Sequence, residues 1–213
     1  MGWLIHYLAY IGLGVSLAAP IGPINTEMLK RGLHRGFWSS WKVGLGGMSA
    51  DILWMVAIIA GLGQLLSTPF LLPCLYVSGS AVFIYLGVDS FRQSRNLSIG
   101  AGESSLRMTL SSSYWSGFAI ALLNPLNLLF WTSIYGTVVG EFIIRQEWGQ
   151  IAAYSTAIIF GIAIWNLNMA FASHYTRRFL TEETLRKIMI AAGLGLIGFG
   201  GYFLYKCVLL LGT

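Results

Sequence analysis

One stretch of ten residues inside the first apolar segment decides the fold: Ala18-Ala19-Pro20-Ile21-Gly22-Pro23-Ile24-Asn25-Thr26-Glu27. Each proline removes a backbone donor from a helix and clashes with the carbonyl group one turn earlier. Inside a membrane, such a break persists only where it is packed within protein or lines a cavity. The glutamate at the end of the stretch is a further candidate, because ionisable residues within membrane spans usually serve a function. The stretch therefore predicts half of a transport site, formed by Pro20, Gly22, Pro23, Asn25 and Glu27.

The composition indicates an integral membrane protein. Of the 213 residues, 56% are apolar and 10% are charged, whereas a soluble domain has roughly 25% charged residues. The apolar segments are long and continuous, which favours spanning helices over the alternating strands of a membrane barrel. The net charge of +5 does not indicate a nucleic-acid partner, because the basic residues lie in short loops between apolar segments, as in membrane proteins generally.

Six segments are long enough to span a bilayer, because about 20 apolar residues cross the hydrocarbon core. They cover residues 3–29, 38–62, 70–91, 114–138, 149–173 and 187–210. The sequence thus predicts an all-α fold with a first three-helix set in residues 1–91, a polar linker in 92–113 and a second three-helix set in 114–213. Because three is odd, the second set crosses the membrane in the opposite sense.

The first span of each set is interrupted by proline, at Pro20 and Pro23 in one set and at Asn124-Pro125 in the other. Interrupted spans at corresponding positions in two halves are typical of transporters built from inverted repeats, and they mark the binding site. The correspondence here is one of position rather than of sequence identity. Broken helices expose amides that suit a carboxylate and carbonyl groups that suit an ammonium group, so the two breaks fit a zwitterion such as an amino acid. Prolines that merely kink packed helices are the alternative.

The Lys and Arg residues predict the orientation in the membrane. Eleven of the 13 lie in or next to three loops, at residues 30–37, 92–113 and 174–187. Basic loops face the cytoplasm. The three loops are therefore expected to be cytoplasmic, and both termini are expected outside.

Asp51 is the strongest single candidate, since it lies mid-span and shares a helix face with Gly44 and Gly47. The glycines let another helix approach, and a carboxyl group at such a contact is what a proton carrier requires. A structural hydrogen bond to a neighbouring span is the alternative. Glu27 has a more ordinary alternative, a surface ion pair with Lys30-Arg31, because those residues follow at i+3 and i+4.

Amides and deep tryptophans complete the candidates. Asn124 can cap the half-helix that begins at Pro125, touch the substrate, or do both. Asn166 lies on the small-residue face of its span and is favoured for the interior over Asn168. Trp131 lies deep enough to line a cavity, but packing is its expected role.

No enzyme is predicted. His6, His34 and His174 are isolated in the sequence, and no metal-hydrolase, nucleophile-elbow or thiol-redox motif occurs. The spans hold few acids and no interior cluster of His or Cys, so neither a metal site nor a cofactor is expected. A homodimer stays open, because the small-residue motifs Gly32-xxx-Gly36 and Gly136-xxx-Gly140 lie at loops or span ends.

Several of these stretches resemble the LysE family of bacterial amino-acid exporters, in the same order and spacing over nearly the whole chain. They are Pro20 to Asn25, Arg31-Gly32 to Gly36, Gly47 to Asp51, Tyr85-Leu86-Gly87 and Leu123-Asn124-Pro125. The resemblance implies six spans, export of amino acids or related small metabolites, and coupling to the proton gradient. Glu27 departs from the family pattern, where an apolar residue is expected, and would fit a subgroup with a different, for example cationic, substrate.

The hypothesis from the sequence is a secondary exporter in the bacterial inner (plasma) membrane that works by proton antiport and is surrounded by the lipid bilayer. Its site is expected where the two breaks face each other, with Asp51 alongside. The alternative is a metal or other ion exporter or channel, as found among more distant relatives of the family.

Overall fold

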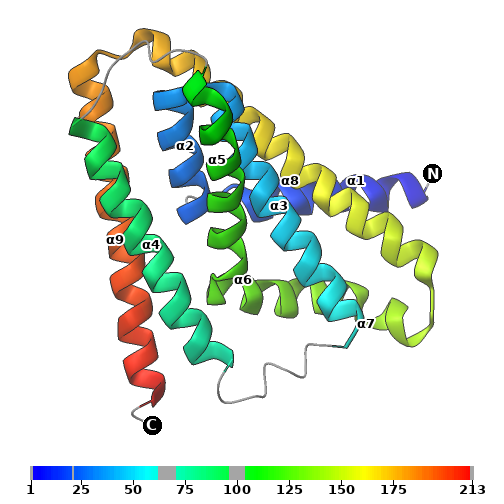
Figure 1. The fold of residues 1–213 in the computed structure, drawn as a ribbon. Coiled ribbons are helices and arrows are strands. Elements are labelled where there is room, and N and C mark those ends of the chain that lie inside the picture. The colour runs from blue at the N-terminus through cyan, green and yellow to red at the C-terminus, as the bar shows by residue number, and fades with distance from the viewer. Residues whose placement is uncertain (1, 21, 62–70, 96–103, 212–213) are drawn as a thin grey trace.

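The computed structural model describes residues 2–20, 22–61, 71–95 and 104–211. Within these ranges every regular element is a helix, so the predicted all-α fold is confirmed. Figure 1 labels most of the elements, which are α1 (Gly2–Ala18), α2 (Pro23–Arg35), α3 (Phe37–Ile59), α4 (Leu71–Arg95), α5 (Ser104–Leu122), α6 (Pro125–Phe130), the π-helical turn η2 (Trp131–Tyr135), α7 (Gly136–Ile144), α8 (Trp148–Thr176), the 3-10 turn η3 (Arg177–Phe179) and α9 (Glu182–Leu211).

Five helical stretches of the described chain are long and apolar enough to cross a membrane. They are Phe37–Ile59, Pro73–Arg92, Pro125–Ile144, Trp148–Thr176 and Glu183–Leu210. A sixth is reached if α1 and α2 form one broken span, since these two helices meet at an angle of 76°. The predicted number of six spans therefore requires the broken span at the N-terminal end.

The first break separates α1 from α2 where the two prolines stand. α1 ends at Ala18, and Pro23 is the first residue of α2. A proline is well tolerated at the first helical position, because the N–H that it lacks would have no partner within the helix. In Figure 1, α1 lies across the other helices, whereas α2 runs close to α5.

The second break lies at Asn124-Pro125, also as predicted. α5 ends at Leu122, and α6 begins at Pro125 in a different direction (Figure 1). The helix before the break begins at Ser104 rather than near Tyr114, so the end of the predicted polar linker is helical. Hydropathy marks where side chains become polar, whereas a helix continues through polar residues as long as no proline or glycine interrupts it.

Two helix crossings flank the space between the breaks: α1 crosses α8, and α3 crosses α5. Each helix of a crossing contributes one glycine. A Cβ added to either glycine would overlap a backbone carbonyl oxygen of the other helix, three residues before that helix's own glycine. The overlaps are Gly14 with Ile158, Gly161 with Ile11, Gly46 with Tyr114, and Gly117 with Val43. Small residues at such positions let helix backbones pack closely within a membrane, so the two crossings depend on the absence of side chains.

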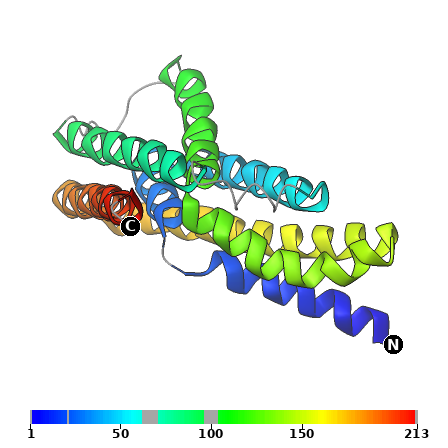
Figure 2. The same ribbon diagram turned by 90° about the horizontal axis from the view of Figure 1, so that it is seen from below.

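α4 and α9 form the third close pair, on the side of the molecule away from the start of α1 (Figures 1 and 2). Ser80 Oγ donates to Gly200 O at 2.8 Å, and Ser90 Oγ donates to Met189 O at 2.7 Å. Hydroxyl-to-carbonyl bonds of this kind stabilise helix pairs in lipid. Figure 2 shows α1 alongside α8 at the other side, so the breaks lie between the α4–α9 pair and the α1–α8 pair.

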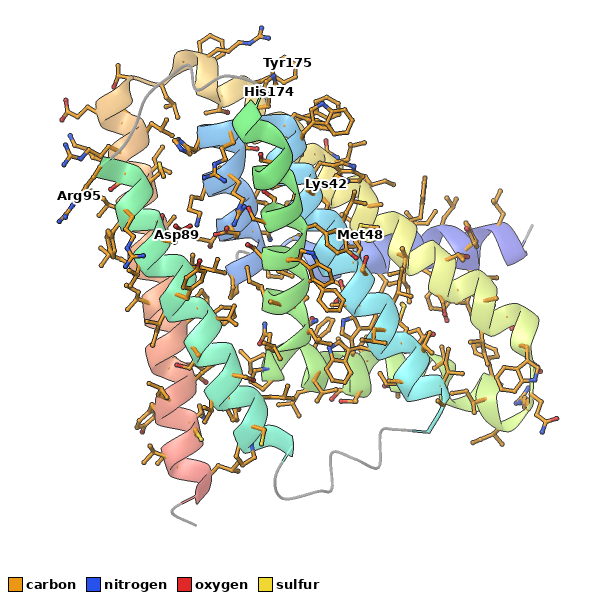
Figure 3. The ribbon with its side chains drawn as sticks, viewed as in Figure 1. Lys42, Met48, Asp89, Arg95, His174 and Tyr175 are labelled. Atoms are coloured by element: carbon orange, nitrogen blue, oxygen red, sulfur yellow. The ribbon has the colours of Figure 1, made fainter. Side chains whose placement is uncertain are left out.

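The helix ends that precede the three basic connections lie at one end of the molecule. In Figure 1 the ends of α2, α4 and α8 lie at the top, and the end of α9 lies at the bottom. Arg95 and His174 mark the same end in Figure 3. The arrangement agrees with a shared side for these loops, and the assignment of that side to the cytoplasm stays a prediction.

Gly32-xxx-Gly36, one of the two small-residue motifs considered for a dimer, takes part in packing within the chain. A Cβ at Gly32 would overlap Ser173 Oγ, so this glycine serves the packing of α2 on α8. Gly136 and Gly140 have no described atom within 4 Å of such a Cβ and leave that face of α7 open. The homodimer itself stays a prediction.

Candidate functional site

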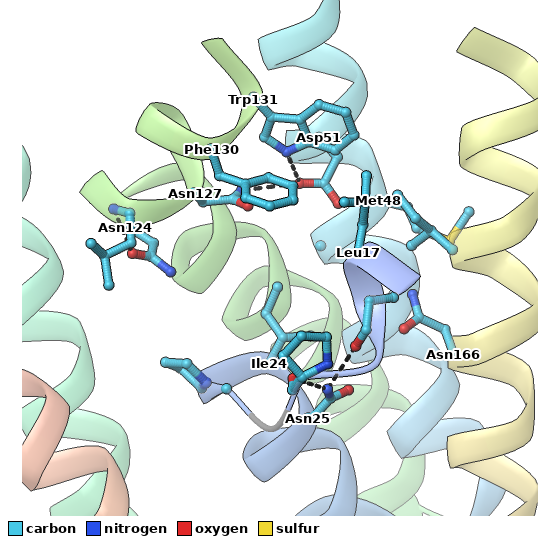
Figure 4. A pocket seen from close by; sticks show the side chains of 17 residues that line it. Leu17, Ile24, Asn25, Met48, Asp51, Asn124, Asn127, Phe130, Trp131 and Asn166 are labelled. Carbon is cyan, nitrogen blue, oxygen red and sulfur yellow. Dashed lines mark hydrogen bonds between the residues drawn. The ribbon is translucent and has the colours of Figure 1, made fainter. Parts of the chain in front are cut away.

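A cavity of about 290 Å³ lies between the two breaks, and Figure 4 shows the side chains that line it. It contains seven of the predicted site residues: Pro20, Gly22, Pro23, Asn25, Asp51, Asn124 and Asn166. Ten further residues line it: Leu17, Ala18, Ile24, Gly47, Met48, Leu126, Asn127, Phe130, Trp131 and Ile162. The remaining predicted residues, Pro125 and Glu27, lie outside this lining. The fold thus brings both breaks and the mid-span acid to one place.

Asp51 reaches this cavity from α3 and is held by two neutral donors (Figure 4). Asn127 Nδ2 and Trp131 Nε1 donate to Asp51 Oδ1 at 3.0 and 2.8 Å. The other carboxylate oxygen, Oδ2, has no hydrogen-bond donor among the described residues. The whole residue is 7% exposed. One oxygen of Asp51 is therefore fixed, and the other is left for a ligand or a proton.

Trp131 combines two roles. It begins η2, the π-helical turn after the second break, and such turns are frequent at functional sites. Its ring packs in a buried cluster with Tyr135 and Ile162, while its indole N–H points to Asp51. The expectation that Trp131 packs is correct but incomplete, because the residue also positions the acid.

Asn25 holds the first break together. Its Nδ2 donates to Ala18 O and to Pro20 O, both at 2.8 Å. Ala18 is the last residue of α1 and Pro20 lies in the break, so both carbonyl groups lack the donors that a continuous helix would supply, and the amide replaces these donors. Trp165 Nε1 donates to Asn25 Oδ1 at 3.3 Å and fixes the amide from α8.

The amino end of α2 borders the cavity without a side-chain cap. Gly22 is the N-cap residue, and Pro23 occupies the first turn. The first amides of a helix have no intrahelical acceptor and carry the positive end of the helix dipole. Because Gly22, Pro23 and Ile24 all line the cavity, this end of α2 offers donors to an anionic group there.

The second break is organised by Asn124 and Asn127. Asn124 Oδ1 accepts a hydrogen bond from Leu126 N at 3.0 Å, so Asn124 caps α6, one of the two roles predicted for it. Pro125 supplies the first helical residue without reaching the cavity. Asn127 Nδ2 bridges Ala121 O, at 3.0 Å, and the carboxylate of Asp51.

Asn166 is the amide that α8 presents to the interior. It is 4% exposed, and its Nδ2 lies 3.5 Å from Gly44 O of α3, at the limit of a hydrogen bond. Asn168 is exposed, and its side chain donates to Ile164 O of its own helix. The predicted interior position of Asn166 is thus confirmed.

Glu27 has two cationic partners and does not line the cavity. Its carboxylate oxygens lie 2.6 Å from Lys30 Nζ and 2.5 Å from Arg31 Nε. The guanidinium group of Arg31 also donates to Ser113 Oγ and Ser116 Oγ of α5, at 2.7 and 2.6 Å. The alternative of an ion pair is correct in its partners, but a surface location is wrong: Glu27 and Lys30 are 0% exposed.

A family model described as LysE type translocator matches residues 15–207 of this chain. The chain belongs to this family. The resemblance predicted from the sequence is therefore confirmed, and with it the prediction of a multi-pass membrane transporter rather than an enzyme.

Similar proteins align with almost the whole chain. The "Putative amino acid efflux protein YcgF" of Bacillus subtilis (strain 168) is 39% identical over 203 residues, 94% of this chain and 95% of the relative. The "Arginine exporter protein ArgO" of Escherichia coli (strain K12) is 22% identical over 197 residues, 88% of each chain. The "Chemotactic transduction protein ChpE" of Pseudomonas aeruginosa is 24% identical over 198 residues, 93% of this chain and 97% of the relative. No solved structure matches the chain.

Asn127 is the site residue of this LysE type translocator that sequence reasoning missed, although a local signal exists. The tripeptide Pro-x-Asn occurs at both breaks, as Pro23-Ile24-Asn25 and as Pro125-Leu126-Asn127. In each copy the asparagine donates to a carbonyl group that its break leaves free. The repeated tripeptide would have pointed to Asn127 without the structure.

Proposed function

We propose that this protein exports an amino acid across the bacterial inner membrane as a secondary transporter. The observation that carries the proposal is the cavity between the breaks, which joins the carboxylate of Asp51 to the uncapped amino end of α2. Amino-acid efflux is also what the names of two relatives describe. The size of the cavity, about 290 Å³, suits a small metabolite, because ligand sites usually start near 300 Å³.

A zwitterion matches the two ends of this cavity. The α-carboxylate of the substrate accepts hydrogen bonds from the first amides of α2, where the helix dipole favours an anion. The α-ammonium group pairs with Asp51 Oδ2, the oxygen that the described residues leave without a donor. Because both ends of the site are fixed by Asn25 and Asn127, the binding groups are in place before the substrate arrives.

Proton antiport follows if Asp51 binds either a proton or the ammonium group of the substrate, but not both. A proton that enters from outside displaces the ammonium group from Oδ2, and release of the proton to the cytoplasm restores the carboxylate. This competition couples substrate exit to proton entry. The proton gradient then drives export.

Alternating access is proposed to come from two inverted three-helix repeats that move against each other. The α1–α8 and α3–α5 crossings have the same glycine-to-carbonyl contacts. The crossing glycine before each break, Gly14 in α1 or Gly117 in α5, is followed at nearly the same distance by a Pro-x-Asn tripeptide. These correspondences support the repeat, whose symmetry axis would pass near the cavity.

The experiment is uptake of labelled amino acids into inverted membrane vesicles that contain the protein. Vesicles with an acidic interior should accumulate a substrate well above vesicles without the protein, and a protonophore should abolish that accumulation. If no amino acid in a broad panel is taken up, the proposed function is wrong. If the protonophore does not change the uptake, amino-acid export is supported but proton antiport is wrong.

An exporter or channel for metal or other ions is the alternative that the sequence leaves open. No observation favours it. Asp51 is the one acid among the described residues that line the cavity, and the described part of the chain contains no group of three His, Cys, Asp or Glu residues able to hold a metal. Divalent cations belong in the uptake panel as competitors.

A further inference from the structure

Asn166 occupies on α8 the position that Asp51 occupies on α3. Each follows a crossing glycine by five residues, Asp51 after Gly46 and Asn166 after Gly161. The two glycines make matching backbone contacts, one with α5 and the other with α1. Both side chains are buried and line the cavity. The cavity therefore has two equivalent polar positions, one with a carboxylate and the other with an amide.

We propose that Asn166 sets the charge that a substrate side chain is allowed to carry. By placing an amide where the other half of the protein places an acid, Asn166 restricts the site to amino acids with an uncharged side chain. This inference rests on the proposed function and names the substrate class of the same site.

The charge of the cavity excludes a second cation. Asp51 is the one ionisable residue among those described as lining it, and the α-ammonium group of the substrate occupies its free oxygen. A side-chain ammonium or guanidinium group would be buried without a counter-charge, which is strongly unfavourable. The residues around Asn166 and the α1 end of the cavity are mostly apolar, among them Leu17, Met48 and Ile162. They suit an uncharged, largely aliphatic side chain.

The Asn166 amide is free to act in selection, because little else holds it. Its hydrogen bond to Gly44 O is 3.5 Å long, and bonds of this length are weak. Figure 4 shows the amide directed toward the space beside Leu17 and Asn25. Glu27 does not supply the missing charge, since its carboxylate is paired outside the cavity. The suggestion of a cationic substrate on the basis of Glu27 is therefore unsupported by the site geometry.

The test compares norleucine with lysine, which have the same four-carbon side chain and differ in the terminal ammonium group. Each is added as an unlabelled competitor of a transported neutral amino acid in vesicles with the wild-type protein. Norleucine should compete at least ~10-fold more effectively than lysine, which corresponds to about 1.4 kcal/mol of discrimination. Equal competition overturns the inference but leaves the proposed export intact. An absence of any transport would instead refute the proposed function.

The Asn166→Asp variant tests the residue itself. It should reduce the preference for norleucine by roughly tenfold or reverse it, because a second carboxylate now pairs with the lysine side chain. Asn166→Ser, which keeps the position neutral, should still reject lysine. Asn168→Asp adds the same charge to α8 outside the cavity and should leave the preference unchanged. Unchanged selectivity in a folded Asn166→Asp protein overturns the inference, and if that variant does not fold, the wild-type comparison decides alone.

Discussion

Glu27 and Asp51 are both acids buried in helices of the membrane region, but their neighbours differ. Glu27 is 0% exposed and contacts two cations, Lys30 and Arg31. Asp51 is 7% exposed, receives two neutral donors on one oxygen and lines a cavity with the other. Burial alone therefore does not identify a functional acid. The partners do, because an acid whose charge is already matched has nothing left to exchange with a ligand.

This comparison predicts that Asp51→Asn has the largest effect on transport. Asparagine keeps an oxygen that can accept from Asn127 and Trp131, so the packing of the site survives. It cannot release a proton or carry a charge to pair with an ammonium group. Proton-driven export should fall to the level of vesicles without the protein, as measured by uptake of labelled substrate with a pH gradient.

The control for Asp51→Asn is its folding. Its melting temperature in detergent and its elution as a single species should stay close to those of the wild-type protein. If the variant exports normally, Asp51 serves as a structural hydrogen-bond acceptor, and the contrast with Glu27 disappears.

Glu27→Gln should affect stability instead. Removing this charge leaves Lys30 and Arg31 buried without the carboxylate that pairs with both of them, and removing one partner of a buried ion pair typically costs about 3–5 kcal/mol. We expect a large loss of folded protein in a thermal unfolding assay. A double variant, Glu27→Gln with Lys30→Met, should recover part of the loss because it removes one of the unmatched charges.

Glu141→Gln is the matched control for that effect. Glu141 pairs with Arg145 at the same i,i+4 spacing as Glu27 and Arg31, but both side chains are more than half exposed. Exposed pairs of this kind contribute little to stability, so unfolding should hardly change. A stable Glu27→Gln protein would show that the buried pair is not needed for the fold and would reopen a direct role for Glu27.

The difference between the two acids also shows how far the sequence leads. Both breaks and Asp51 were predictable, because a proline or an acid within an apolar span is a local signal. The burial of Glu27 was not, since Lys30 and Arg31 near a helix end usually face water. It depends on α5, which brings Ser113 and Ser116 against the guanidinium group. The sequence pattern does not reveal that contact between distant segments.

The same limit explains the incomplete interpretation of Trp131 and the late predicted start of α5. Trp131 reaches Asp51 because it lies four residues after Asn127 on the same helix face, and both side chains donate to the acid of α3. The sequence pattern does not reveal which helix lies opposite that face. α5 begins at Ser104 because its polar first turns are compatible with a helix. Hydropathy reports only which side chains suit lipid, and it therefore places the start of the segment too late.

Trp131→Phe is expected to reduce export less than Asp51→Asn does, and it separates the effect on transport from the effect on stability. The change removes one donor from Asp51 and keeps an aromatic ring in the core. A hydrogen bond to a charged group is worth about 1.5–3 kcal/mol, so export should fall by a factor of roughly 10 to 150, with a modest change in melting temperature. Trp54→Phe is the matched control: Trp54 borders the same buried cluster, but its indole N–H has no partner among the described residues. If both variants reduce export equally, ring packing and not the bond to Asp51 is what transport requires, and the neutral donors would lose their role in distinguishing Asp51 from Glu27.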